Sequence, residues 1–265
     1  MKILLKNARL IDPVNGTDEI GDLLISDNLI AEIGIVTGSA DRIIECDGKC
    51  LAPGIVDIGV KVCEPGERHK ESFRSAGLAA AAGGVTTIVT RPDTVPAIDS
   101  PETLEFVKRR GQDSAPVHLL PMAALTKDRA GREMTEIGFL LDAGAVAFTD
   151  GDNVITDNKV LSRCMTYVRS LGALVIGHPQ DPSLSTGGAT TSGKFASLRG
   201  LPSVSPMAER LGLERDLALV EMSGVKYHAD QLSTAAALPA LRRAKAAGLD
   251  VTAGVSIHHL TLTGF

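Results

Sequence analysis

The hydrophobic pattern of this chain changes character after its first 52 residues. Up to that point, short segments rich in β-branched residues are separated by turn-forming pairs such as Asn15-Gly16 and Asp47-Gly48. Short apolar segments between such pairs are typical of β-strands joined by tight turns. The expected strands are residues 3–10, 22–26, 29–33 and 42–45. We therefore expect residues 1–52 to form a small antiparallel sheet, one half of a β-sandwich.

From residue 53 onward, nearly continuous apolar runs alternate with segments of helical period. The apolar runs are residues 54–62, 85–91, 117–124, 145–150, 173–179, 225–232 and 251–259. Continuous apolar runs indicate parallel strands that are covered on both faces. A series of strand–helix repeats predicts an α/β fold, a (β/α) barrel of the TIM type with seven of its eight strands present. Residues 53–265 are expected to form this barrel, incomplete at the C-terminus because the chain is truncated.

Between these runs, some segments carry clear signals for helix ends. Ser100-Pro101 predicts an N-cap followed by a proline in the first helical turn, and Gly172 is a typical helix stop. The expected helices are residues 101 to about 110, 157–171 and 236–247. Residues 183–200 are rich in Gly, Ser and Thr and lack periodicity, so we expect a mobile loop over the mouth of the barrel.

Composition and charge narrow the classes of function. The net charge is −5, and no basic run is longer than residues 108–110, which argues against nucleic acid as the main partner. No apolar run approaches membrane-spanning length, and the N-terminal apolar stretch is too short for a signal peptide. We therefore expect a cytoplasmic protein. Its four cysteines form no Cys-x-x-Cys pair and are expected to be buried or inert: Cys46, Cys50, Cys63 and Cys164.

One stretch at the start of the barrel region has the most specific pattern. Residues 57–66 read Asp-Ile-Gly-Val-Lys-Val-Cys-Glu-Pro-Gly. This resembles the first barrel strand of the dihydroorotase family of cyclic amidohydrolases, where the pattern is Asp-x-His-x-His-x-Arg-Glu-Pro-Gly and both histidines bind metal. Asp57 and the Glu-Pro-Gly match, but the histidine positions hold Gly59 and Lys61 and the arginine position holds Cys63.

The changes at the two histidine positions remove ligand atoms from the metal site that the resemblance implies. Glycine has no side-chain donor, and a lysine ammonium has no lone pair. Zinc in such a site lowers the pKa of a bound water, and Gly59 with Lys61 cannot hold it. One hypothesis is that Lys61 instead supplies positive charge beside Asp57 and Asp150. The alternative is that Lys61 simply extends into solvent.

The remaining strand ends match the family only in part. The resemblance implies substrate-binding side chains at Asp93, where the family has asparagine, and at His258. Asp93 equally well caps the following turn. Asp150 corresponds to an aspartate that is both base and metal ligand in the family, although it also fits a loop residue. His178 matches a metal ligand, but a lone histidine is more often structural. Gln231 replaces a further ligand histidine.

These observations leave three interpretations of function. The leading one is a dihydroorotase-like protein of pyrimidine biosynthesis without catalytic activity or cofactor, which is a homo-oligomer and a structural or regulatory partner of aspartate carbamoyltransferase. The second is an active dihydroorotase or other cyclic-amide hydrolase, cleaving a C–N bond with zinc in an altered site. That site would use Asp150, His178 and either His228 or His258. The third is a fragment with no function of its own.

Overall fold

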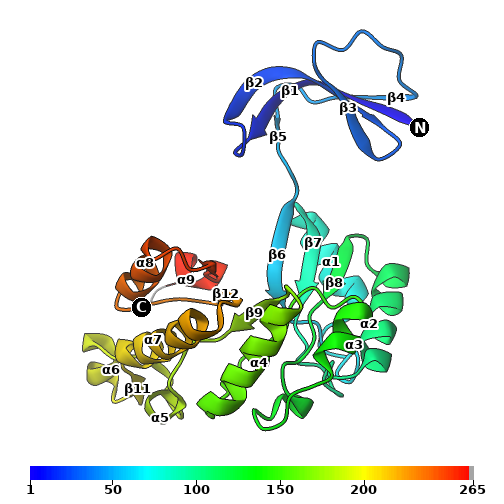
Figure 1. Ribbon diagram of the computed structural model, residues 1–265. Coiled ribbons are helices and arrows are strands. Elements are labelled where there is room, and N and C mark those ends of the chain that lie inside the picture. Colours follow the sequence, from blue (N-terminus) through cyan, green and yellow to red (C-terminus); the bar gives the residue numbers. More distant parts are fainter. Residues whose placement is uncertain (263–265) are drawn as a thin grey trace. The chain divides into compact units, whose positions relative to one another are not determined.

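The computed structural model of the chain describes residues 1–262 (Figure 1). Contacts between residues divide the chain into two compact units, and the first of them is Met1–Ile55. Within the described residues, no helix is long and apolar enough to cross a membrane.

The first unit is a mixed five-stranded sheet. Its strands are β1 (Lys2–Asp12), β2 (Thr17–Ser26), β3 (Leu29–Gly34), β4 (Arg42–Glu45) and β5 (Cys50–Leu51). The order is β3-β2-β1-β4, and β5 also pairs with β1. The turn between β2 and β3 uses Asp27 and Asn28 at φ 51° and 68°, as a tight hairpin requires.

The expectation of a purely antiparallel sheet was wrong for two of these strands. β2 runs antiparallel to β1 and β3, but β4 and β5 run parallel to β1. The reason lies in the connection between β3 and β4, which crosses from one edge of the sheet to the other and so reverses the chain direction relative to a hairpin.

The second unit is an α/β arrangement of two short parallel sheets. Its strands are β6 (Ile55–Val60), β7 (Val85–Thr90), β8 (His118–Pro121), β9 (Leu174–Gly177), β12 (Lys226–Ala229) and β13 (Val251–Ala253). One sheet has the order β6-β7-β8 and the other β13-β12-β9. The α/β class predicted from the sequence is confirmed, and within residues 1–262 the strands do not close into a complete barrel.

The fourth expected strand, residues 145–150, is not a regular strand. Isolated bridges join Phe148 to Ala123 on one side and to Val175 on the other. The Phe148 backbone N–H donates to Leu174 O at 2.9 Å, and Ala123 N–H donates to Ala147 O at 3.0 Å. The segment therefore lies between β8 and β9 and links the two sheets. Gly144 and Gly151, both at positive φ, bound the segment on its two sides.

Helices follow most of these strands. They are α1 (Phe73–Ala82), α2 (Pro101–Ser114), α3 (Ile137–Asp142), α4 (Asn158–Ser170), α7 (Pro206–Ser223), α8 (Leu238–Ala246) and α9 (Ile257–Thr261), with a 3-10 turn at Lys127–Arg129. The expected N-cap is present, since Ser100 Oγ accepts from the Thr103 N–H at 3.4 Å. The apolar sides of the larger helices pack on the strands to form one core, which includes Phe73, Leu104, Phe148, Met165, Leu213 and Tyr227.

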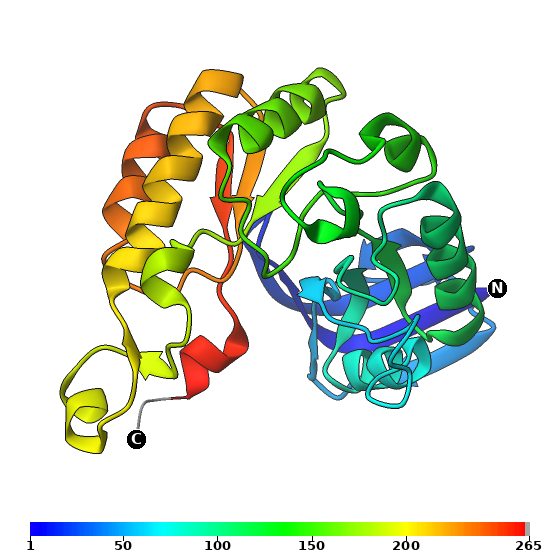
Figure 2. The ribbon, with the colours of Figure 1, turned by 90° about the horizontal axis from the view of Figure 1, so that it is seen from below.

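Two segments differ from the sequence-based expectation. Residues 183–200, expected to be a loop, contain parts of α5 (Pro182–Ser185), β10 (Thr190–Thr191) and α6 (Lys194–Arg199), and β10 pairs with β11 (Ser203–Val204). Helix α7 was not predicted, although it lies beside α8 in Figure 2 as one of the main helices. Its buried face carries Glu209 and Asp216, and these two polar residues interrupt the apolar periodicity.

Candidate functional site

The carboxyl ends of the parallel strands carry the polar side chains that the sequence singled out. In α/β folds of this type, side chains at these ends meet at one edge of the strands and form the usual location of a binding or active site. Gly59 and Lys61 lie at the end of β6, Arg91 and Asp93 follow β7, and Asp230 follows β12. We call this edge the mouth.

Gly59 has a backbone that few other residues adopt. Its φ is +93°, and a Cβ added there would lie 3.3 Å from Nε of Arg91 and 3.8 Å from Oδ2 of Asp230. The position therefore requires glycine for its conformation and also leaves little room for a larger side chain.

Lys61 pairs with a different aspartate from those named in the sequence-based hypothesis. Lys61 Nζ lies 3.0 Å from Oδ2 of Asp93, and no ion pair joins it to Asp57 or Asp150 among the described residues. The Lys61 side chain is 55% exposed and that of Asp93 is 2% exposed. The other Asp93 oxygen, Oδ1, is buried without a hydrogen-bond partner in the described part of the chain. Asp93 therefore carries a buried charge whose partner is Lys61.

Arg91 is a second buried charged side chain of the mouth, and no role was predicted for it from the sequence. Its side chain is 7% exposed. Nη1 lies 2.6 Å from Oδ1 of Asp152, and Nη2 forms a further ion pair with Oδ2 of Asp230. Burial by itself would lower the pKa of Arg91, but the two carboxylates outweigh that effect and the net pKa is raised.

The sequence did contain a signal for this cluster. Arg91 directly follows an apolar strand, at a position where the chain is still covered by other elements. A buried charge needs partners of the opposite sign, and carboxylates at the ends of other strands are the available ones. Its partners, Asp152 and Asp230, come from the segment after Phe148 and from the end of β12.

Asp150, the candidate base and metal ligand, is fully engaged with its surroundings. The residue is buried, Oδ1 accepts from the Thr126 backbone N–H at 2.9 Å, and Oδ2 accepts from the Thr126 hydroxyl. Burial raises the pKa of Asp150, and the hydrogen bonds from Thr126 act in the opposite direction. These contacts tie the segment after Phe148 to the end of the loop at Thr126.

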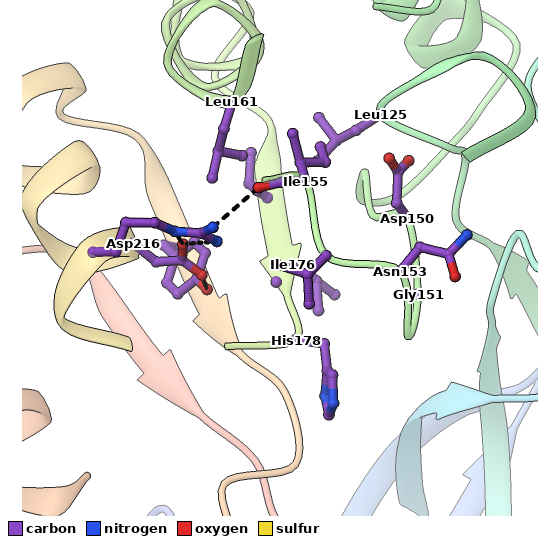
Figure 3. A pocket seen from close by; sticks show the side chains of 14 residues that line it. Leu125, Asp150, Gly151, Asn153, Ile155, Leu161, Ile176, His178 and Asp216 are labelled. Carbon is purple, nitrogen blue, oxygen red and sulfur yellow. Dashed lines mark hydrogen bonds and ion pairs between the residues drawn. The ribbon is translucent and has the colours of Figure 1, made fainter. Parts of the chain in front are cut away.

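His178, the candidate ligand on β9, lines a small cavity together with Asp150. This cavity of ≈ 30 Å³ has Asp150, His178, Asp216 and Tyr227 among its lining residues. Figure 3 shows the His178 ring and the Asp150 carboxylate pointing in different directions. His178 Nε2 lies 3.2 Å from Gln180 Oε1, while Nδ1 is buried without a partner among the described residues. The volume is enough for a water molecule but not for a substrate.

A larger cleft opens along β6, β12 and the residues after β13. Its volume is ≈ 640 Å³, and Gly59, Arg91, Gln231 and His258 are among its lining residues. Gln231 Nε2 donates to Oδ2 of Asp230 at 3.3 Å. His258 is exposed, near the start of α9. The other candidate substrate contact, Asp93, is not part of the lining. The two predicted substrate-binding residues therefore do not face one common cleft.

His228 was predicted as one alternative ligand of an altered metal site. In the structure its imidazole is hydrogen-bonded to a threonine. Its Nδ1 lies 2.8 Å from Oγ1 of Thr252 on the neighbouring strand. Burial lowers the pKa of His228, and the nearby Asp230 acts in the opposite direction. A neutral imidazole bonded to Thr252 supports the pairing of β12 with β13.

The donor set of the mouth does not fit the zinc site that the sequence resemblance implies. Gly59 and Lys61 offer no lone pair, and Gln231 turns its amide nitrogen toward Asp230. Within residues 1–262, no group of three or more His, Cys, Asp or Glu side chains is arranged to hold a metal ion. The cations at this edge are instead the ammonium of Lys61 and the guanidinium of Arg91.

Comparison with known proteins gives matches over nearly the whole chain. The model of the dihydro-orotase-like family matches residues 48–237. A dihydroorotase of Syntrophus aciditrophicus (strain SB) is 38% identical over 266 residues, which cover 99% of this chain and 62% of that protein. A dihydroorotase-like protein of Pseudomonas putida is 39% identical over 265 residues, with the same coverage of 99% and 62%. The chain thus spans about three fifths of the length of the curated relatives it matches.

Solved structures show the same fold. The L-hydantoinase (dihydropyrimidinase) from Arthrobacter aurescens superimposes with a TM-score of 0.83 at 21% identity, covering 98% of this chain and 59% of that chain. At this level of identity the likeness concerns the fold alone.

Proposed function

Because the chain belongs to the dihydroorotase-like family, we propose that it is a member of that family which serves pyrimidine biosynthesis without hydrolysing a cyclic amide itself. The single observation that carries this proposal is the absence of metal-ligand atoms in the side chains of Gly59 and Lys61, at the end of β6. Gly59 has no side chain, and Lys61 Nζ lies 3.0 Å from Asp93 Oδ2, so neither position presents a donor to a metal ion.

The chemistry of ring opening supports the same proposal. Hydrolysis of a cyclic amide needs an activated water and a polarised carbonyl group, which a metal ion supplies in metal-dependent hydrolases. The candidate base here, Asp150, accepts hydrogen bonds from Thr126 at both carboxylate oxygens. Its lone pairs are therefore partly used in holding the loop, which favours a structural role over proton transfer.

The role that we propose for such a member is assembly with aspartate carbamoyltransferase, as a homo-oligomer. This part rests on the family resemblance, because non-catalytic dihydroorotase-like proteins act in that way. No particular surface of this chain is assigned to the partner.

Metal analysis with an activity assay tests the proposal directly. We expect the purified full-length protein to contain well under one zinc per chain and to show no turnover of dihydroorotate. The dihydroorotase of Syntrophus aciditrophicus, 38% identical, prepared in the same way, is the matched control. Stoichiometric zinc together with turnover would contradict the proposal.

The proposed partnership needs its own experiment. We expect the protein to co-elute with aspartate carbamoyltransferase from the same organism in size-exclusion chromatography, at a volume different from either alone. Separate elution at micromolar concentrations would contradict the partnership and leave the absence of catalysis standing.

One observation favours a second candidate function, an active cyclic-amide hydrolase with an altered zinc site. His178 Nδ1 is buried without a partner and lies in the wall of the cavity that Asp150 also lines. An unpartnered imidazole nitrogen is a possible ligand atom. If this function holds, added Zn²⁺ produces turnover of dihydroorotate or hydantoin, and His178→Ala abolishes it. An unchanged, zero rate with Zn²⁺ argues against it.

A further inference from the structure

We propose that Arg91 is a fixed internal cation that ties three strand ends of the mouth together, so that this edge is held in place without a metal ion. The inference extends the proposed function. In this proposal, the Arg91 side chain joins the end of β7 to Asp152 and Asp230, which lie on other parts of the fold.

The contacts of Arg91 reach three parts of the fold. Its backbone N–H donates to Val60 O at 3.0 Å, which joins the ends of β7 and β6. Nη1 is 2.6 Å from Asp152 in the segment after Phe148, and Nη2 pairs with Asp230 at the end of β12. The guanidinium therefore connects the sheet β6-β7-β8 to Asp152, which follows the linking segment, and to Asp230, which follows β12 of the sheet β13-β12-β9.

The shape of the guanidinium suits this role. Its two Nη atoms are held in one rigid plane and contact carboxylates on two different elements. A lysine ammonium has the charge and three donors, but it is a compact group on a flexible stem and lacks the rigid fork that holds two carboxylates in fixed positions. The two-pronged shape of the guanidinium therefore explains why the position suits arginine better than lysine.

The surrounding charges show what depends on Arg91. The other groups at this edge are Lys61, whose partner is Asp93, together with Asp57 and His228. The Asp230 side chain is 13% exposed and that of Asp152 is 60% exposed. Asp230 is thus the carboxylate that loses most when the guanidinium is removed, because water reaches it least.

Gly59 belongs to the same arrangement. A side chain at residue 59 would begin 3.3 Å from Arg91 Nε, on the side of the strand where the guanidinium lies. The absence of a side chain at this position is therefore what leaves room for the guanidinium. Gly59 leaves space beside the strand, and the Arg91 guanidinium occupies that space.

A double-mutant cycle on the full-length protein tests the inference. We expect Arg91→Met to lower the melting temperature by about 5–10 °C, as breaking a buried pair does in a domain of this size. Asp230→Asn should cost less, and the double variant should recover part of the loss because the uncompensated carboxylate is gone. Arg91→Lys should fall between wild type and Arg91→Met. Arg132→Met, at an exposed arginine, is the matched control and should leave the melting temperature unchanged.

A second cycle keeps the test decisive if Arg91→Met does not fold. Asp152→Asn and Asp230→Asn leave the arginine in place and remove its partners one at a time. We expect their combined loss of melting temperature to exceed the sum of the single losses, because only the double variant leaves Arg91 buried without any carboxylate.

The outcomes separate this inference from the proposed function. Additive effects in either cycle, or an unchanged melting temperature for Arg91→Met, would overturn the inference alone. A chelator such as EDTA should leave the melting temperature of the wild type unchanged. A fall of several degrees with EDTA would overturn both, since the mouth would then be held by a metal ion.

Discussion

The two halves of the segment 57–66 have different kinds of neighbours. In the second half, Glu64 is buried and accepts from the Phe73 N–H at 3.1 Å and from Arg110 Nε at 3.0 Å, so it anchors the start of α1. In the first half, Lys61 pairs with Asp93 at the mouth, and a Cβ at Gly59 would approach Arg91 and Asp230. One part of this motif therefore holds the chain in its path toward α1, and the other part contributes to the mouth.

Apart from Asp57, the residues that match the family pattern are Glu64, Pro65 and Gly66, which lie where the chain passes from β6 toward α1. Glu-Pro-Gly is needed for the chain to turn from β6 toward α1, whatever chemistry occurs at the mouth. Of the residues that differ from the pattern, Lys61 pairs with Asp93, and Gly59 lies against the Arg91 side chain. A protein can therefore keep the fold signature of a family and lose its ligand set, because different contacts maintain the two.

The largest effect that this comparison predicts is at Gly66. Its φ is +103°, and a Cβ would lie 2.4 Å from the Val95 carbonyl oxygen, which is backbone and cannot move aside. We expect Gly66→Ala to destabilise the protein by about 3–5 kcal/mol in chemical denaturation, from overpacking and backbone strain. Gly172→Ala is the control, because Gly172 has φ +69° with nothing within 4 Å, and it should cost about 1 kcal/mol. Equal losses for the two variants would show that contact with Val95 does not matter.

The next effect is at Glu64. Glu64→Gln keeps the shape of the side chain but removes the charge that faces Arg110 and the N-terminus of α1. We expect a loss of about 2 kcal/mol in the free energy of unfolding, because the carboxylate is buried and its donors are left with a weaker acceptor. Glu105→Gln, in an exposed pair with Lys108, should change the free energy by less than about 0.5 kcal/mol. If Glu64→Gln lowers the free energy of unfolding no more than Glu105→Gln does, the hydrogen bonds of Glu64 do not stabilise the start of α1.

A smaller effect is expected at Gly59. Gly59→Ala must adopt φ +93° and approach Arg91 Nε to 3.3 Å, a contact that a shift of a few tenths of an ångström relieves. We expect a loss of about 1–2 kcal/mol, measured by denaturant unfolding. If the guanidinium is what the new methyl group meets, the loss in an Arg91→Met background should be smaller than in the wild type. The same loss in both backgrounds would assign the whole effect to the backbone.

The smallest effect is expected at Lys61. Its ammonium pairs with a buried carboxylate, but the lysine side chain is more than half exposed, so solvent screening reduces the energy of the pair. We expect Lys61→Met to cost about 1 kcal/mol, and Asp93→Asn in the same chain to restore part of it. Full stability of Lys61→Met would mean that the pair with Asp93 contributes nothing.

Much of the scaffold could be predicted because its signals are local. Ser100 before Pro101 fixed the start of α2, and Gly172 marks the end of α4. Helix α7 was missed because Glu209 and Asp216 lie on its buried face. Glu209 accepts hydrogen bonds from Ser233 and Thr234, and Asp216 accepts from the Tyr227 hydroxyl at 2.6 Å. Those partners are distant in sequence, so the helix does not read as amphipathic.

The mouth was harder to predict for the same reason. Matching against the family pattern directed attention to the positions of lost ligands, among them Gly59 and Lys61. The charge partners of Arg91 were not predicted, because neither of them lies near it in the sequence. Its pairing with Asp152 and Asp230 joins residues 61 and 139 positions apart. Only the folded arrangement of strand ends shows that these groups meet.

The close approach of Arg91 to Gly59 has a consequence for the substitutions that these two positions tolerate. A histidine placed at residue 59 would meet the guanidinium, and removal of the guanidinium would leave Asp230 without its cation. A single substitution at either position therefore gives a less stable protein. The two positions constrain each other, so a larger residue at 59 is expected to be tolerated better when residue 91 is smaller.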